Sequence, residues 1–107
     1  MTPSGSGKRP AARPTVQVEN DRVRVTEWRF APGAATGWHR HAYDYVVVPM
    51  TSGKLRLDDG KSQTDADLAI GRPYFRPVGV EHDVINVNDY EFVFVEIEVK
   101  TPAAPEK

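Results

Sequence analysis

Short segments in which apolar and polar residues alternate constrain this chain more than any other feature of its sequence. TVQVE at 15–19 alternates in this way, and turn sequences such as NDR, DG and NDY separate successive segments. A period of two residues is typical of β-strands, and no stretch shows the 3.6-residue period of a helix. Seven to nine short strands with regularly spaced turns predict an all-β sandwich or barrel.

Two of the predicted strands depart from simple alternation. In 91–99, Phe92 and Phe94 lie on one face, and three valines and an isoleucine lie on the other. A strand that is apolar on both faces is typically buried on both sides, so we expect one face in the barrel core and the other in a dimer interface. In 23–30 the apolar residues change face midway, which predicts a bend or bulge in that strand.

The length and composition narrow the class of protein. The chain has 107 residues, which suits one domain, and we place a β-barrel at 15–101 between flexible tails at 1–14 and 102–107. It contains no cysteine, which excludes disulfides and thiolate-bound zinc.

The charge balance and the apolar segments bear on partners and location. The net charge of −1 does not favour nucleic acid or an anionic membrane as a partner. GSGK near the start is not a phosphate-binding loop, because Arg-Pro follows the lysine. No apolar run could span a bilayer and no secretory signal is visible, so we expect a soluble cytoplasmic protein.

The chain has three histidines, and two of them form an H-x-H pair at His39 and His41. On a strand, residues two apart point to the same face, so the two imidazoles could aim at one point. Taken alone, the pair fits either two loop histidines or half of a metal site. The third histidine, His82, lies in the segment GRPYFRPVGVEHDVIN.

The spacing around these histidines resembles the two signature motifs of the cupin superfamily. In the second motif, the matching positions are Gly71, Pro77, Gly79, His82 and Asn86. In the first motif, the matching positions are Gly33, His39, His41 and Gly53. The resemblance covers about half of the chain. It implies a double-stranded β-helix, the jelly-roll cupin barrel, with one divalent metal held by His39, His41 and His82.

The chain departs from the family pattern at the glutamate that usually follows the second histidine. Tyr45 and Val46 occupy the expected positions, and Asp44 lies one residue earlier. Strand parity places Tyr45 on the face of the histidines and the other two on the opposite face. Tyr45 is therefore the candidate catalytic residue, as a weak ligand or a hydrogen-bond partner of metal-bound water. Simple packing against the barrel wall is the alternative.

Three neutral imidazoles leave open positions on a metal, which is typical of catalytic sites. Imidazole suits Fe, Zn and Ni alike, and the resemblance to three-histidine cupin dioxygenases favours Fe(II). Asn86 is a candidate to orient the imidazoles. Glu96 could also reach the pocket if its face of the strand lines the barrel, and the alternative is a solvated strand end. Arg40 and Arg76 could attract an anion.

Several functions stay open at this point. One is a mononuclear metal-dependent dioxygenase, isomerase or lyase acting on a small carboxylate or diketone. Others are a non-catalytic cupin that binds a metal or small ligand, and a structural cupin homodimer. The segment WHRHAYDYVVVP is also similar to chains described as β-alanine-degradation proteins.

Overall fold

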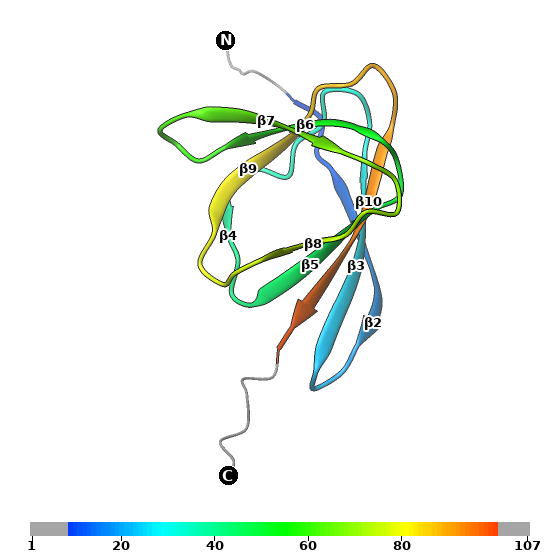
Figure 1. Cartoon of the computed structure of the whole chain (residues 1–107), viewed down its shortest axis with the longest axis vertical. Helices are drawn as coiled ribbons and strands as arrows, with labels where there is room; N and C mark the ends of the chain where they lie inside the picture. Colours follow the sequence, from blue (N-terminus) through cyan, green and yellow to red (C-terminus); the bar gives the residue numbers. More distant parts are fainter. Residues whose placement is uncertain (1–8, 101–107) are drawn as a thin grey trace.

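The structure is a computed structural model that describes residues 9–100, and within them it contains strands and no helix (Figure 1). This confirms the predicted all-β class. Residues 1–8 of the predicted N-terminal tail, residue 101 at the end of the predicted barrel and the whole predicted C-terminal tail, 102–107, lie outside the described residues. The strands are β2 (Arg13–Glu19), β3 (Val23–Phe30), β4 (His39–Arg40), β5 (Asp44–Pro49), β6 (Gly53–Asp58), β7 (Gln63–Leu68), β8 (Tyr74–Arg76), β9 (Glu81–Asn86) and β10 (Phe92–Val99).

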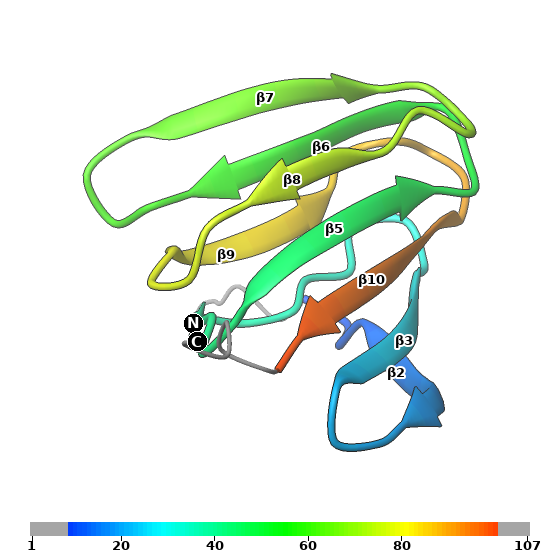
Figure 2. The same cartoon turned by 60° about the horizontal axis from the view of Figure 1, so that its bottom comes forward.

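The strands form two antiparallel sheets that curve around a common interior (Figure 1). The larger sheet has the order β2-β3-β10-β5-β8, and the smaller has the order β4-β9-β6-β7. Figure 2 shows β10 between β5 and β3, at the centre of the larger sheet. The first half of β10 is apolar on both faces, and Phe92, Val93 and Phe94 are buried.

The core lies between the sheets, where Phe30, Phe92 and Leu55 are at most 1% exposed. The rings of Phe30 and Phe94 pack with their centroids 5.4 Å apart. The interior also contains a cavity, and several core side chains line it, among them Val47, Leu55 and Phe94.

Two details differ from the sequence predictions. The bulge is in β2, between Val16 and Val18, whereas β3 pairs with β10 without any shift in register. The chain also joins the barrel before residue 15, because β2 begins at Arg13 and Ala12 donates its N–H to the Ala35 carbonyl at 2.9 Å. The composition of residues 1–14 predicted a tail, but composition describes side chains, and this contact is a hydrogen bond between backbone groups. No helix in the described part is long and apolar enough to cross a membrane.

Candidate metal centre

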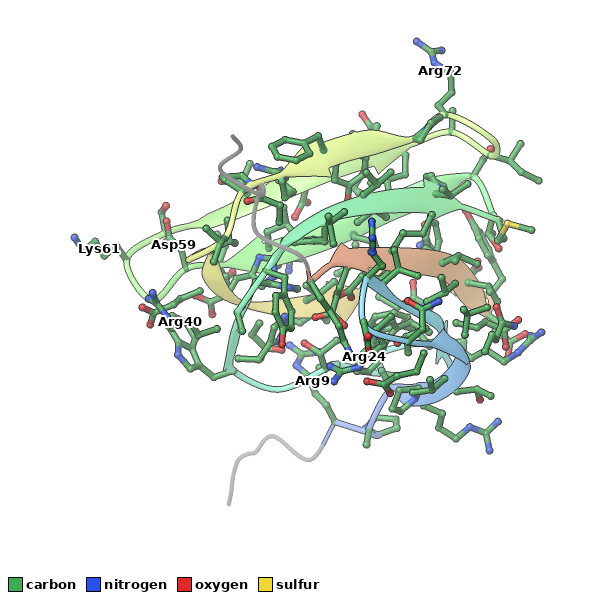
Figure 3. All side chains as sticks on the ribbon, turned by 90° about the horizontal axis from the view of Figure 1, so that it is seen from below. Arg9, Arg24, Arg40, Asp59, Lys61 and Arg72 are labelled. Atoms are coloured by element: carbon green, nitrogen blue, oxygen red, sulfur yellow. The ribbon has the colours of Figure 1, made fainter. Side chains whose placement is uncertain are left out.

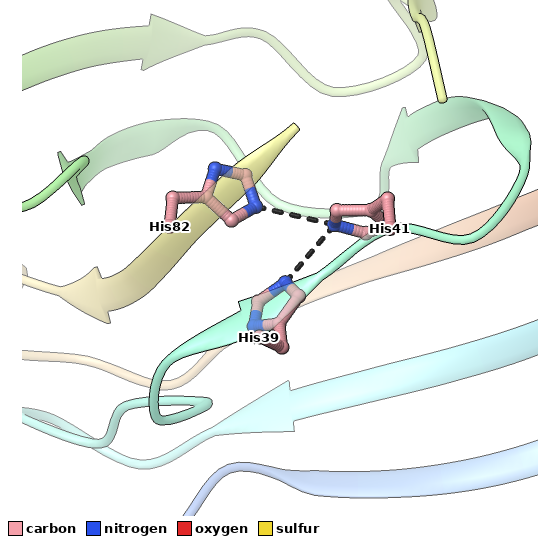
Figure 4. Close-up of side chains that lie close together, drawn as sticks. All are labelled: His39, His41 and His82. Atoms are coloured by element: carbon pink, nitrogen blue, oxygen red, sulfur yellow. Dashed lines mark hydrogen bonds between the residues drawn. The ribbon is translucent and has the colours of Figure 1, made fainter. Parts of the chain in front are cut away.

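The three histidines converge at one end of the barrel interior (Figure 4). His39 on β4 and His82 on β9 are direct partners in the antiparallel register, and His41 follows β4 immediately. Nε2 of His41 lies 2.9 Å from Nε2 of His39 and 3.2 Å from Nε2 of His82. The three nitrogens therefore face a common centre, and the group could hold a metal ion.

The backbone of the second motif holds His41 in place. His41 donates its N–H to the Val80 carbonyl at 2.8 Å, and Gly79 donates its N–H to the His41 carbonyl at 2.9 Å. Gly79 has a φ of 97°, a left-handed conformation that favours glycine. The turn between β8 and β9 therefore depends on this motif glycine and brings His82 opposite the H-x-H pair.

The outer nitrogen of His39 has a defined partner. Its Nδ1 lies 2.9 Å from the Gly37 carbonyl oxygen, which can only accept a hydrogen bond. The proton of neutral His39 therefore sits on Nδ1, which leaves the lone pair of Nε2 directed at the common centre. Sequence reasoning missed this partner, because a backbone carbonyl carries no signal in the sequence.

Glu96 is the corresponding neighbour of His41. It is only 8% exposed, and its Oε2 lies 3.6 Å from Nδ1 of His41, slightly beyond hydrogen-bond length. The pKa of Glu96 is raised to about 7, mainly by burial and also by the charge of Glu98, while the indole of Trp28 acts in the opposite direction. A carboxylate behind a metal-binding imidazole is a common arrangement for orienting the ring. Glu96 thus reaches the pocket, as its strand face predicted.

Glu96 also belongs to a second group of side chains that could hold a metal ion. Ligand atoms of His41, Glu96 and Glu98 lie within 4.8 Å of one another. Glu98 is paired with Arg24 at 3.4 Å, so one of the two carboxylates is already occupied. The three-imidazole group is therefore the better candidate metal centre.

Asn86, the other candidate for orienting the imidazoles, makes hydrogen bonds to backbone carbonyls instead. It is 1% exposed, and its side-chain amide donates to the carbonyls of Tyr90 at 2.8 Å and Phe30 at 3.1 Å. It ties the loop before β10 to the end of β3. Asn86 therefore stabilises the barrel rather than the imidazoles.

Two of the three imidazoles, those of His41 and His82, are held in their neutral form. The pKa of His41 is lowered to about 3, mainly by burial and also by the neighbouring His39 and His82. Burial also lowers the pKa of His82 to about 4, with His39 and Arg76 contributing. Neutral imidazole is the form that binds metal, so the site is ready for a cation at neutral pH.

Tyr45 lies on β5 with its side chain inside the barrel, as strand parity predicted. Its ring stacks on the His41 ring, with the centroids 3.8 Å apart and an interplanar angle of 15°. Burial raises the pKa of Tyr45, so its hydroxyl stays protonated. Within residues 9–100 this hydroxyl has no hydrogen-bond partner. Asp44, by contrast, is exposed and accepts the Val78 N–H at 2.8 Å.

The histidines and Tyr45 line a cavity of about 540 Å³ whose walls come from both sheets. Its wall includes Trp28, whose Nε1–H is buried and has no hydrogen-bond partner within the described residues. This N–H is close enough to Glu96 to lower the pKa of that carboxyl, so the two side chains form a polar patch in the cavity wall. The site can therefore hold a small molecule next to a metal ion.

Comparison with known proteins gives two relatives of high identity. The chain is 60% identical over 92 residues to the β-alanine degradation protein BauB of Pseudomonas aeruginosa, covering 86% of this chain and 97% of the relative. It is 62% identical to a solved cupin domain from Bordetella pertussis, covering 88% of this chain and 98% of that one, with a TM-score of 0.86.

A more distant structure supports the fold alone. A double-stranded β-helix protein from Klebsiella pneumoniae is 21% identical, with a TM-score of 0.71, covering 96% of this chain and 85% of that one. No family model matches the chain.

Proposed function

Because this chain belongs to the cupin superfamily, we propose that it binds one divalent metal through His39, His41 and His82 and acts as a metal-dependent enzyme on a small carboxylate or diketone. The observation that carries the proposal is the convergence of three imidazole Nε2 atoms beside a cavity. Three protein ligands with free positions are typical of catalytic rather than structural metal sites.

The name of one relative supports the choice of substrate class. BauB is described as a β-alanine degradation protein, and this chain covers nearly all of it at 60% identity. β-Alanine and its degradation products are small carboxylates, which fit a cavity of about 540 Å³.

Each residue of the site has a role in this proposal. A bound metal would act as a Lewis acid or, if it is iron, would support oxygen chemistry. The Gly37 carbonyl and Glu96 orient the rings of His39 and His41. Tyr45 keeps its proton and can donate it, or a hydrogen bond, to a ligand in the cavity.

The outer face of the larger sheet supports the proposal of a homodimer. Strand register places one apolar row across all five strands, comprising Val18, Val25, Ile97, Val46 and Phe75. Phe75 is 60% exposed and Val18 is 45% exposed at the two ends of this row. A continuous apolar stripe of this kind favours contact with a second copy of the chain.

Metal content tests the proposed function directly. We expect about one metal per chain by plasma mass spectrometry on tag-free protein, and loss of that metal in His82→Ala. Reconstitution with Fe(II), Zn(II) or Ni(II) would then precede screening of small carboxylates, with oxygen for the iron form. Absence of metal in the wild type after reconstitution, or equal content in His82→Ala, would contradict the proposal.

A further inference from the structure

One row of polar side chains crosses the inner face of the larger sheet. Strand register places Glu19, Arg24, Glu98, Tyr45 and Arg76 side by side, on β2, β3, β10, β5 and β8 in turn. All five side chains line the cavity. Adjacent residues in such a row contact one another, so their charges must be considered together.

The charged side chains at the β2 end of this row form ion pairs with one another and with Lys100. Arg24 lies 3.0 Å from Glu19 and 3.4 Å from Glu98. Lys100 adds a second contact to Glu19 at 2.7 Å. Each carboxylate in this part of the row therefore already has a cationic partner.

Arg76, at the other end, differs from the other arginines that line the cavity. Arg24 is paired as described, and Arg40 lies 3.2 Å from Glu81. Arg76 forms no ion pair with any residue of the described part of the chain. Its guanidinium lies 5.5 Å from the centroid of the Tyr74 ring, a contact that positions the cation without neutralising it.

Arg76 also lies close to the metal centre. Its partner in the register is Tyr45, and the Tyr45 ring stacks on His41 at 3.8 Å. The positive charge of Arg76 is near enough to His82 to lower the pKa of that imidazole. The unneutralised guanidinium and the three histidines therefore flank the same part of the cavity.

We propose that Arg76 binds the carboxylate of the ligand, while a second oxygen or nitrogen donor of the same molecule faces the histidine centre. A guanidinium offers parallel N–H donors that match the two oxygens of a carboxylate. The ligand class is thus a short carboxylate with a second donor group, which excludes neutral molecules of the same shape. This inference rests on the proposed function and adds the residue that selects the substrate class.

The test uses malonate as the probe and malonamide, its neutral diamide, as the matched control ligand. Binding is measured by calorimetry on the full chain, both metal-free and loaded with Co(II), whose visible absorption reports metal occupancy. We expect malonate to bind the wild type and malonamide not to bind. Arg76→Met should weaken malonate binding about ten- to a hundredfold, and Arg76→Lys should weaken it less.

Arg72→Met is the matched control variant. Arg72 is exposed and projects away from the barrel, whereas Arg76 lines the cavity (Figure 3). We expect Arg72→Met to bind malonate as the wild type does. Circular dichroism on each variant confirms that the barrel is folded.

Three results would overturn the assignment of Arg76: equal malonate affinity in Arg76→Met and wild type, equal affinity for malonamide and malonate, or no malonate binding by the wild type. Failure of the wild type to take up Co(II) would instead refute the metal site. In that case Arg76-dependent binding of malonate to the metal-free protein would still support the role of Arg76.

Discussion

Replacing Glu96 with glutamine should stabilise the metal-free protein at alkaline pH and weaken metal binding. Glu96 is buried, and its pKa rises from 4.5 to about 7 on folding. Below pH 4.5 the carboxyl is protonated in both states, so its contribution to stability is fully present. Between pH 4.5 and 7 the unfolded chain ionises first, and the free energy of unfolding falls as pH rises.

The size of this effect follows from the same values. Each pH unit between the two pKa values contributes about 1.4 kcal/mol, so the wild type loses about 3 kcal/mol by pH 8. Glutamine does not ionise and escapes this loss. We therefore expect metal-free Glu96→Gln to be more stable than the wild type by up to about 3 kcal/mol at pH 8, and equal to it near pH 4.5.

Urea unfolding of the metal-free protein at pH 4.5, 6 and 8 measures the difference. Glu91→Gln is the matched control, because Glu91 precedes the same strand but is exposed and paired with Arg29 at 3.2 Å. A stability difference that does not change with pH, or a Glu96→Gln protein less stable than the wild type at pH 8, would refute the reasoning.

The affinity for metal should fall in Glu96→Gln, although the stability of the metal-free protein rises. Loss of the carboxylate behind Nδ1 of His41 should weaken metal binding about ten- to a hundredfold. Competition with a fluorescent chelator at pH 7.5 measures this change. Unchanged affinity would mean that Glu96 does not orient the imidazole.

Three further predictions concern the rest of the molecule. The low pKa values of His41 and His82 mean that the unfolded chain binds more protons below pH 6.5, so their contribution to stability is lost as pH falls from 6.5 toward 4. In metal-free Glu96→Gln the Glu96 carboxyl no longer opposes this effect, so urea unfolding should show a free energy of unfolding that decreases from pH 6.5 to pH 4. A free energy of unfolding that does not change with pH would contradict the prediction. Tyr45→Phe should retain about one metal per chain by plasma mass spectrometry, because the Tyr45 ring stacks on His41; loss of metal would make the phenol a ligand. Phe75→Glu places a charge at the exposed end of the apolar row and should convert the proposed dimer to a monomer. Light scattering measures the mass, and a mass equal to that of the wild type would mean that this face does not form the dimer interface.

Local pattern in the sequence determined the class of fold and the three histidines of the candidate metal centre. The two-residue period showed that the chain forms strands, and it also showed which face of each strand a side chain occupies. His39 and His41 share a face for this reason, and the motif spacing added His82 from the neighbouring strand. Tyr45 was placed inside the barrel by the same parity.

The tertiary structure alone decided which residues of distant strands meet. Glu96 lies 3.6 Å from His41 because β10 occupies the centre of the larger sheet, and parity could say only that it faces inward. The row in which Arg76 has no ion-pair partner among residues 9–100 likewise depends on the register of five strands, as does the position of the bulge in β2. Strand order and register arise from pairing between segments far apart in the chain, and the periodicity within one segment carries no information about its partner.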